Sequence, residues 1–250
     1  MASGLAGRGR MLEAAELVGH IRQVIGESGP LKGRSVVVTA GGTQEPLDPV
    51  RVLANRSSGK QGFALAQAAV DRGAEVVLIC GPSALPTPIG ALRIDVQTAA
   101  EMRKATLEAA RKADALLMAA AVADYRPASA STHKIKRGRD SLALSLEPTD
   151  DILRAVAEGR SKGGRPKVVV GFAAESQDLV VNALAKLKAK DLSLIVANDI
   201  TSPGAGFSVD TNRVTLIGPD GSVQALPVMS KVEVAEVVLD RVVQLLSSAV

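Results

Sequence analysis

The sequence predicts an α/β fold, a doubly wound and mostly parallel sheet with helices on both of its faces. Three observations predict it. Short β-branched runs alternate with stretches of helical spacing along the 250 residues, and this order specifies parallel strands joined by helical crossovers. The hydrophobic fraction of 46% is enough for one large core. Glycines also follow the ends of apolar runs, where open α/β sheets bind ligands.

The elements follow in order along the chain. Residues 11–25 repeat apolar side chains at helical spacing before a Gly-Pro turn, so we expect a lead-in helix and linker over residues 1–32 and a single α/β domain over residues 33–250. Within that domain we expect a Rossmann-like alternation: strand 35–40, helix 59–72, strand 75–80, helix 98–112, strand 114–120, helix 150–159, strand 167–173, helix 177–190 and strand 192–197.

Local chemistry supports the first of these elements. Val36 to Thr39 form a β-branched run that is typical of a buried parallel strand. The following helix carries apolar residues such as Phe63 and Leu65 and stops at Gly73.

Two segments interrupt the alternation. Residues 128–147 are polar and basic before a strand of period two, which predicts a small β-ribbon flap. Residues 213–226 read as a hairpin that turns at Pro219, Asp220 and Gly221. A final helix over residues 230–246 then closes the domain.

Composition limits the classes of function. The net charge is +4 with a pI near 9.3, and the basic residues are spread along the chain, which suits small acidic ligands. The aromatic fraction is 2% and Trp is absent, so we expect no nucleic-acid partner. No apolar stretch reaches the length of a membrane span. Cys80 is the single cysteine, so we expect a buried structural thiol in a reducing cytoplasm. Two histidines argue against a His-rich metal site.

The segment from residue 36 to residue 62 predicts an anion-binding site. Gly41 follows the first strand, and Ser57, Gly59 and Gly62 surround the start of the next helix. Helix N-termini present free N–H groups to phosphates, and glycines let oxygen atoms approach the backbone. The alternative is an ordinary glycine-containing loop.

Two common nucleotide motifs do not fit this segment. A Walker A loop needs Gly five residues before its Gly-Lys pair and Ser or Thr after it, but this chain has Ala54 and Gln61. A dinucleotide fingerprint opens its helix directly, and its second strand ends in an acidic residue, whereas here Cys80 and Gly81 end that strand. A dinucleotide dehydrogenase is therefore disfavoured.

Three further strand ends carry candidate ligand residues. Asp124 follows strand 114–120, although a helix-cap or turn role is the alternative. Phe172 lies near the end of strand 167–173 and would pack on a nucleobase or in the core. Asn198 follows strand 192–197. We expect all these loops to converge on one crevice at the carboxyl ends of the strands.

Basic residues lie near the same crevice. Lys134, Lys136 and Arg137 form the basic edge of the flap, suited to phosphates, with a solvated loop as the alternative. Lys186 and Lys190 are four residues apart on one helix face. Taken alone, that pair is equally typical of an exposed helix surface.

Six motifs together resemble one family. The segments TAGGTQEPLDPVR, NRSSGK, AAVADY, KIKR, GFAAE and ANDI, within residues 33–245, resemble phosphopantothenoylcysteine synthetase of the bacterial, CTP-dependent type. That type is usually the ligase half of a bifunctional protein with a flavin-dependent decarboxylase, and GRGRMLEAAEL is similar to the junction of the halves. The resemblance implies a reaction in which CTP activates 4'-phosphopantothenate as an acyl-cytidylate with release of pyrophosphate, after which L-cysteine forms the amide and CMP leaves.

The resemblance also implies residue roles. Asn55 would orient the pantothenoyl carboxylate, Arg51 would bind the substrate phosphate across the interface of a homodimer, and Lys134 would approach the nucleotide phosphates to promote turnover. Asp124 would bind near the junction of nucleotide and substrate. The remaining nucleotide contacts would be Gly41, Ser57, Gly59, Gly62, Ala120, Phe172, Lys186 and Lys190, and the remaining substrate contacts Ala120, Ala121 and Asn198. Mg²⁺ would accompany the triphosphate, with protein ligands that the sequence does not identify.

Two departures and two alternatives stand beside this resemblance. Arg137 replaces the last Lys of the family's KIKK segment, and Asp150 replaces a common Pro. The alternative functions are an NAD(P)-dependent reductase of Rossmann type and a non-catalytic sensor of coenzyme A precursors.

Overall fold

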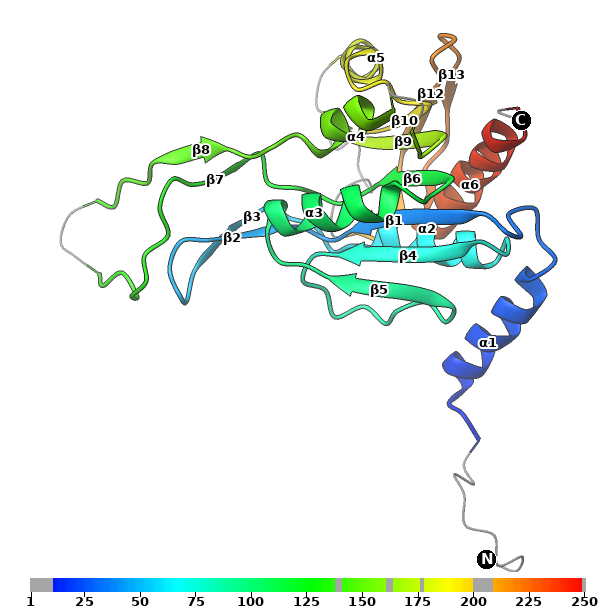
Figure 1. Ribbon diagram of the computed structural model, residues 1–250, viewed down its shortest axis with the longest axis horizontal. Coiled ribbons are helices and arrows are strands. Elements are labelled where there is room, and N and C mark those ends of the chain that lie inside the picture. Colours follow the sequence, from blue (N-terminus) through cyan, green and yellow to red (C-terminus); the bar gives the residue numbers. More distant parts are fainter. Residues whose placement is uncertain (1–10, 138–140, 161–163, 176–177, 200–208, 249–250) are drawn as a thin grey trace, which may run out of the picture.

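A computed structural model describes residues 11–137, 141–160, 164–175, 178–199 and 209–248. An eight-stranded sheet lies at its centre, with strand order β13-β12-β10-β9-β6-β1-β4-β5 (Figure 1). Its strands are β1 (Ser35–Ala40), β4 (Glu75–Cys80), β5 (Ala91–Asp95), β6 (Ala115–Met118), β9 (Val168–Glu175), β10 (Leu194–Asp199), β12 (Val214–Ile217) and β13 (Val223–Ala225). The helices are α1 (Ala14–Gly26), α2 (Lys60–Val70), α3 (Ala99–Ala110), α4 (Ile152–Arg160), α5 (Leu179–Ala189) and α6 (Lys231–Ser248).

The direction of the strands confirms the predicted fold class. Neighbours from β5 to β10 are parallel, whereas β12 pairs antiparallel with both β10 and β13. In the parallel part, β4 and then β5 lie on one side of β1. The strands β6, β9 and β10 follow in that order on its other side. The winding therefore reverses between β1 and β6, which is the switch point where doubly wound sheets bind ligands.

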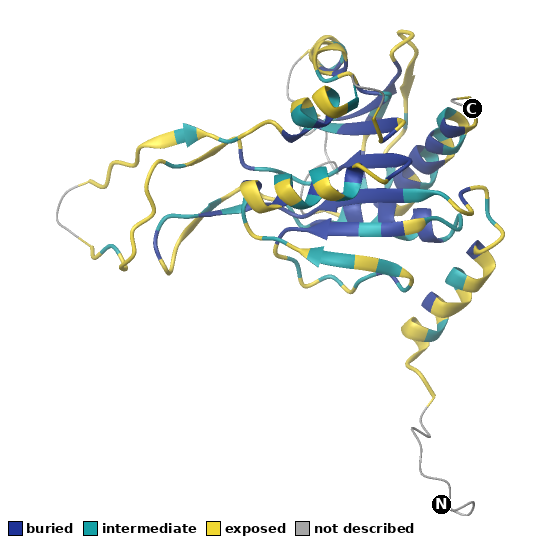
Figure 2. Ribbon diagram, viewed as in Figure 1, coloured by how far each residue is buried: buried dark blue, intermediate teal, exposed yellow. Residues whose placement is uncertain are grey.

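The strand β1 shows why the sheet needs helices on both faces. Val36 and Val38 point to the cluster that contains side chains of α2 and α6. Val37 points to the opposite cluster, which contains side chains of α3, α4 and α5. Successive side chains of a strand alternate between the two faces of the sheet. The side chains of a continuous apolar run are therefore buried on both faces, and Figure 2 shows the central strands as buried.

The predicted strands and helices are found with ends shifted by a few residues, but the edge strand β5 was not predicted. Its side chains are only partly buried and Leu92 is 63% exposed, so it lacks the buried apolar run that indicated the other strands. The prediction also lacked a small hairpin, β2 (Gln44–Pro46) paired with β3 (Val52–Ala54). Its three-residue strands are too short for a periodicity to register.

The predicted flap has a paired base. Strands β7 (Tyr125–Pro127) and β8 (Leu146–Pro148) are antiparallel, and the ribbon extends well beyond the sheet (Figure 1). Residues 138–140 of the flap and residues 1–10 of the predicted lead-in segment lie outside the described residues.

The helix α1 lies within the predicted lead-in segment and is joined to the body by an ion pair. Arg22 Nε donates to Asp71 at 3.0 Å. The division into a lead-in segment and one domain stays a prediction. Among the described residues, no helix combines the length and the apolar character that crossing a bilayer would require.

Gly62 packs the start of α2 against β1. An added Cβ would lie 2.5 Å from Ala40 Cβ and 2.9 Å from Thr39 O. We expect Gly62→Ala to lower the free energy of unfolding by about 1–3 kcal/mol, more than the ~1 kcal/mol that Ala gains over Gly in a helix. Urea denaturation measures this.

A matched glycine provides the control for that experiment. Gly159 in α4 has no heavy atom within 4 Å of an added Cβ. Gly159→Ala should leave stability unchanged or raise it by about 0.5–1 kcal/mol. Equal effects of the two substitutions would contradict the packing role of Gly62.

Candidate active site at the carboxyl edge of the sheet

A pocket of about 550 Å³ lies outside the carboxyl ends of the parallel strands. The loop after β1 meets the loop after β6 at its floor. Gly42 and Ala121 form a parallel bridge, Ala121 N donates to Gly41 O at 2.8 Å, and Thr43 N donates to Ala121 O at 3.3 Å. The pocket therefore sits at the switch point of the sheet.

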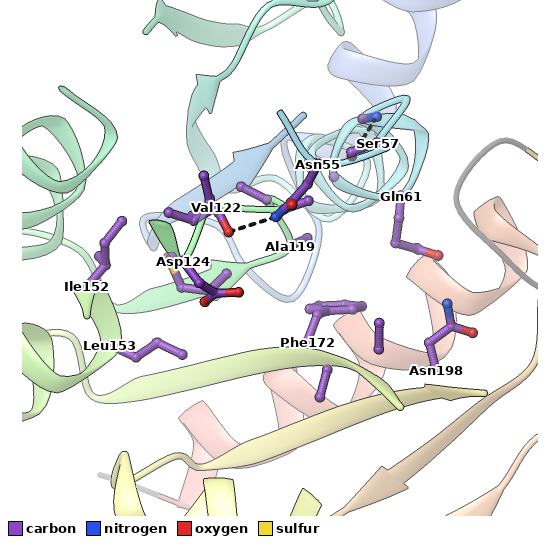
Figure 3. A pocket seen from close by; sticks show the side chains of 18 of the residues that line it. Asn55, Ser57, Gln61, Ala119, Val122, Asp124, Ile152, Leu153, Phe172 and Asn198 are labelled. Carbon is purple, nitrogen blue, oxygen red and sulfur yellow. Dashed lines mark hydrogen bonds between the residues drawn. The ribbon is translucent and has the colours of Figure 1, made fainter. Parts of the chain in front are cut away.

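Two threonine side chains fix the backbone of the loop after β6 by accepting hydrogen bonds from its N–H groups. Ala120 N donates to Thr39 Oγ1 at 3.2 Å, and Ala123 N donates to Thr43 Oγ1 at 2.9 Å. Both threonines are fully buried. The rigid backbone leaves Asp124 exposed beside the pocket, where Figure 3 shows its carboxylate.

Asn55 is positioned by the short hairpin that precedes it. Its Nδ2 donates to Val122 O at 2.9 Å across the pocket rim (Figure 3). This bond joins the NRSSGK segment to the AAVADY segment and fixes the plane of the Asn55 amide. Asn55 is exposed, so its amide can meet a ligand.

The start of α2 carries the features of an anion site. Gly59 occupies the N-cap with φ +77° and no side chain caps this end of the helix. An L residue would be strained at that φ. A Cβ on Gly59 would also lie 3.3 Å from Gly41 N. The backbone of Gly41 therefore packs directly against Gly59 and leaves little room for a side chain there.

The opposite wall comes from β9, β10 and α5. Phe172 presents its ring to the pocket between Asp124 and Asn198 in the view of Figure 3. Lys190 Nζ lies 3.1 Å from Asp151 Oδ2, a carboxylate that the sequence reasoning did not select. Asn198 Oδ1 is buried without a hydrogen-bond partner among the described residues.

Most of the predicted site residues line this pocket. They are Asn55, Ser57, Gly59, Gly62, Ala120, Ala121, Asp124, Phe172, Lys186, Lys190 and Asn198. Gly41, Arg51 and Lys134 do not line it. All of these roles stay predictions.

Arg51 instead joins the hairpin to the flap. Its Nη2 donates to Asp48 Oδ2 at 2.5 Å and to Ile135 O at 2.9 Å. The hydrogen bond from Arg51, together with backbone N–H donors that include Ile135 N, holds the pKa of Asp48 well below its usual range. Lys134 is exposed in the flap next to this contact. Arg51 and Lys134 thus lie together, outside the pocket of their own chain.

The sequence reasoning missed Lys231, a buried lysine that lines the pocket at the start of α6. Lys231 is 6% exposed, and its Nζ donates to Val209 O at 2.6 Å. Burial, and then the nearby Lys60, lower the pKa of Lys231, while Asp210 raises it. No glycine motif precedes Lys231, so its sequence carried no local signal.

Fold and pocket together define a doubly wound α/β domain with a ligand site at the switch point of its sheet. The chain belongs to the family described as "DNA/pantothenate metabolism flavoprotein C-terminal domain", whose profile matches residues 31–246. The predicted resemblance to the phosphopantothenoylcysteine synthetases, the ligase domain of coenzyme A biosynthesis, is thereby confirmed.

Individual relatives agree with this family. The coenzyme A biosynthesis bifunctional protein CoaBC of Bacillus subtilis (strain 168) is 44% identical over 98% of this chain and 60% of its own length. A protein named cysteine/cysteine sulfinic acid decarboxylase, from an unknown prokaryotic organism, is 43% identical over 98% of this chain and 69% of its own length.

A solved structure matches over the whole of its own chain. The C-terminal domain of a coenzyme A biosynthesis bifunctional protein CoaBC has a TM-score of 0.74 and 37% identity, covering 88% of this chain and 100% of that one. The present chain is thus similar to the C-terminal domain of that bifunctional protein. It spans about 60% of the length of the bifunctional relative from Bacillus subtilis.

Proposed function

We propose that this chain is a phosphopantothenate-cysteine ligase that uses CTP. The carboxylate of 4'-phosphopantothenate attacks the α-phosphorus of CTP, giving an acyl-cytidylate and pyrophosphate. The amine of L-cysteine then attacks the activated carbonyl, so that 4'-phosphopantothenoylcysteine forms and CMP leaves. The observation that supports this most strongly is the convergence of Asn55, Asp124 and Asn198 on one pocket in a chain of this family.

The first step must bring two anions together. The uncapped start of α2 offers backbone N–H groups, and Lys60, Lys186 and Lys190 add positive charge along the pocket. Preorganised donors of this kind contribute about 3–4 kcal/mol each to catalysis. Asn55, held by Val122 O, would orient the carboxylate and then the acyl-cytidylate. The mechanism needs no protein nucleophile, and Cys80 is buried with its pKa raised by burial to about 11.

Mg²⁺ is expected with the nucleotide. The part of the chain that the structure describes contains no group of three or more His, Cys, Asp and Glu side chains arranged to hold a metal ion, although Asp124, Asp150 and Asp151 each line the pocket. This donor set fits an ion held chiefly by phosphate oxygens and water, with Asp124 as the candidate protein ligand. When bound, the ion would neutralise charge on the triphosphate.

The expected partners extend beyond the substrates. A homodimer would bring Arg51 of the β2–β3 hairpin and Lys134 of the projecting ribbon to the pocket of the partner subunit. The hairpin and ribbon carry exposed apolar side chains, among them Val50 at 63%, Tyr125 at 55% and Leu144 at 46% exposed, which such an interface would cover. We also propose association with a flavin-dependent decarboxylase, since the Bacillus subtilis relative is bifunctional, and a cytoplasmic location.

Pyrophosphate release tests the proposed function. The protein is incubated with 4'-phosphopantothenate and Mg²⁺, with CTP or ATP, and with or without cysteine. We expect release that depends on CTP and is sustained only when cysteine is present. No release with either nucleotide would contradict the ligase. Release with ATP alone would contradict the nucleotide preference.

A further inference from the structure

Two lysines begin the two helices that meet at one wall of the pocket. Lys60 is the first residue of α2, Lys231 is the first residue of α6, and both line the pocket. Gln61 Nε2 donates to Lys231 O at 3.0 Å. This bond ties the two helix starts together, so the lysines keep a fixed relation to each other.

The pair places a partly exposed cation, Lys60, beside a buried one, Lys231. Lys231 is 6% exposed, and Lys60 lies near enough to lower its pKa. Among the described residues, the carboxylate of Asp210 interacts with both lysines. It lies 2.6 Å from Lys60 Nζ, but its side chain is 83% exposed, so water screens its charge. Two cations held close together, one of them buried, favour an anionic ligand that offsets their repulsion.

The ends of the two helices differ in a way that points to the same ligand. At α6, Glu233 N donates to Ser230 Oγ at 3.1 Å and Ser230 N donates to Glu233 Oε2 at 2.7 Å, so this helix is capped by its own residues. At α2, no side chain caps the helix and the first turn has no acidic residue. A lysine at the positive end of a helix is unfavourable, unless an anion binds there.

We propose that Lys231, together with Lys60 and the start of α2, binds the β- and γ-phosphates of the nucleotide and holds the pyrophosphate that leaves in the first step. This assignment rests on the proposed ligase function. Two cations and free N–H groups suit a polyphosphate better than a single phosphate. Figure 3 places Gln61 toward Asn198 and away from Asp124 and Ile152, which leaves the other side of the pocket for the reacting carboxylate.

Calorimetric titration of the protein with inorganic pyrophosphate, and separately with Mg-CTP, tests the assignment. Lys231→Met keeps the length and apolar stem of the side chain but removes its charge, and Lys60→Met does the same at the exposed side of the pair. We expect each variant to bind both ligands about tenfold or more weakly. Affinity for 4'-phosphopantothenate should change less than about twofold.

Lys112→Met is the matched control. Lys112 is exposed, follows α3 and does not line the pocket, so its loss should leave all three affinities unchanged. This comparison separates a local phosphate contact from a general effect of net charge. Circular dichroism verifies that each variant is folded, and Lys60→Met decides the matter if Lys231→Met does not fold.

Three outcomes would overturn the assignment. They are unchanged affinity for pyrophosphate and CTP in the folded variants, a loss confined to 4'-phosphopantothenate, and no binding of pyrophosphate by the unaltered protein. A different result would contradict the proposed ligase function. If the unaltered protein binds pyrophosphate through these lysines yet forms no product, the ligase is contradicted and the phosphate site stands.

Discussion

Asn55→Ala is expected to abolish detectable product formation while the protein stays folded. The side chain is exposed, so its removal leaves no cavity in the core. What is lost is the hydrogen bond to Val122 O and the amide that would orient the pantothenoyl carboxylate. Removing one preorganised donor costs on the order of 10²–10³ in kcat, and both steps of the proposed reaction use this one.

Two further variants sharpen the Asn55 experiment. Asn55→Asp keeps the shape of the side chain but replaces the amide with a carboxylate, which would repel the substrate carboxylate, so we expect it to be inactive as well. Asn182→Ala removes an exposed asparagine of α5 that does not line the pocket, and activity should stay within about twofold. Steady-state product formation is the measurement, and full activity in Asn55→Ala would refute the assigned role.

Mixing two inactive variants should restore activity. We expect Arg51→Ala alone to lose activity on the order of 10²-fold, because the charge-assisted contact proposed between Arg51 and the substrate phosphate would be removed. The hairpin itself should survive, since Asp48 keeps backbone donors at Val50 N, Arg51 N and Ile135 N, with distances of 2.8, 2.9 and 3.0 Å.

The recovery follows from the symmetry of a dimer. If Arg51 acts on the partner's pocket, a dimer of one Arg51→Ala chain and one Asn55→Ala chain contains one complete site. Random subunit exchange at equal concentrations would then restore about a quarter of the unaltered activity. Each variant mixed with itself is the control, and sedimentation measures the dimer. No recovery in verified mixed dimers would contradict action across the interface.

The sequence predicted the central sheet because the relevant signals are local. Val36 to Ala40 form a strand that is buried on both faces and is apolar except at Thr39. Edge elements carried no such signal, since β5 is partly exposed and the β2–β3 hairpin has strands of three residues. Their existence depends on pairing with neighbours, which is a property of the folded chain.

The site residues likewise fall into those that local sequence could predict and one that it could not. Asn55, Gly59 and Asp124 could be selected from the sequence because each follows or precedes a strand or helix in a short motif, and the structure brings them to one pocket. Lys231 could not be selected, because it reaches the pocket only when α6 packs beside α2 and Gln61 binds its carbonyl.

The sequence by itself determined the α/β class, the order of the central strands along the chain and the motifs of the ligand loops, because periodicity and glycine placement act over a few residues. Tertiary structure alone decided that Lys231 joins Lys60 at the pocket wall, and that Arg51 binds Asp48 and Ile135 outside the pocket of its own chain. The pairing of Lys231 with Lys60 and the contact of Arg51 with Ile135 each join residues more than eighty positions apart, and packing of distant elements sets them.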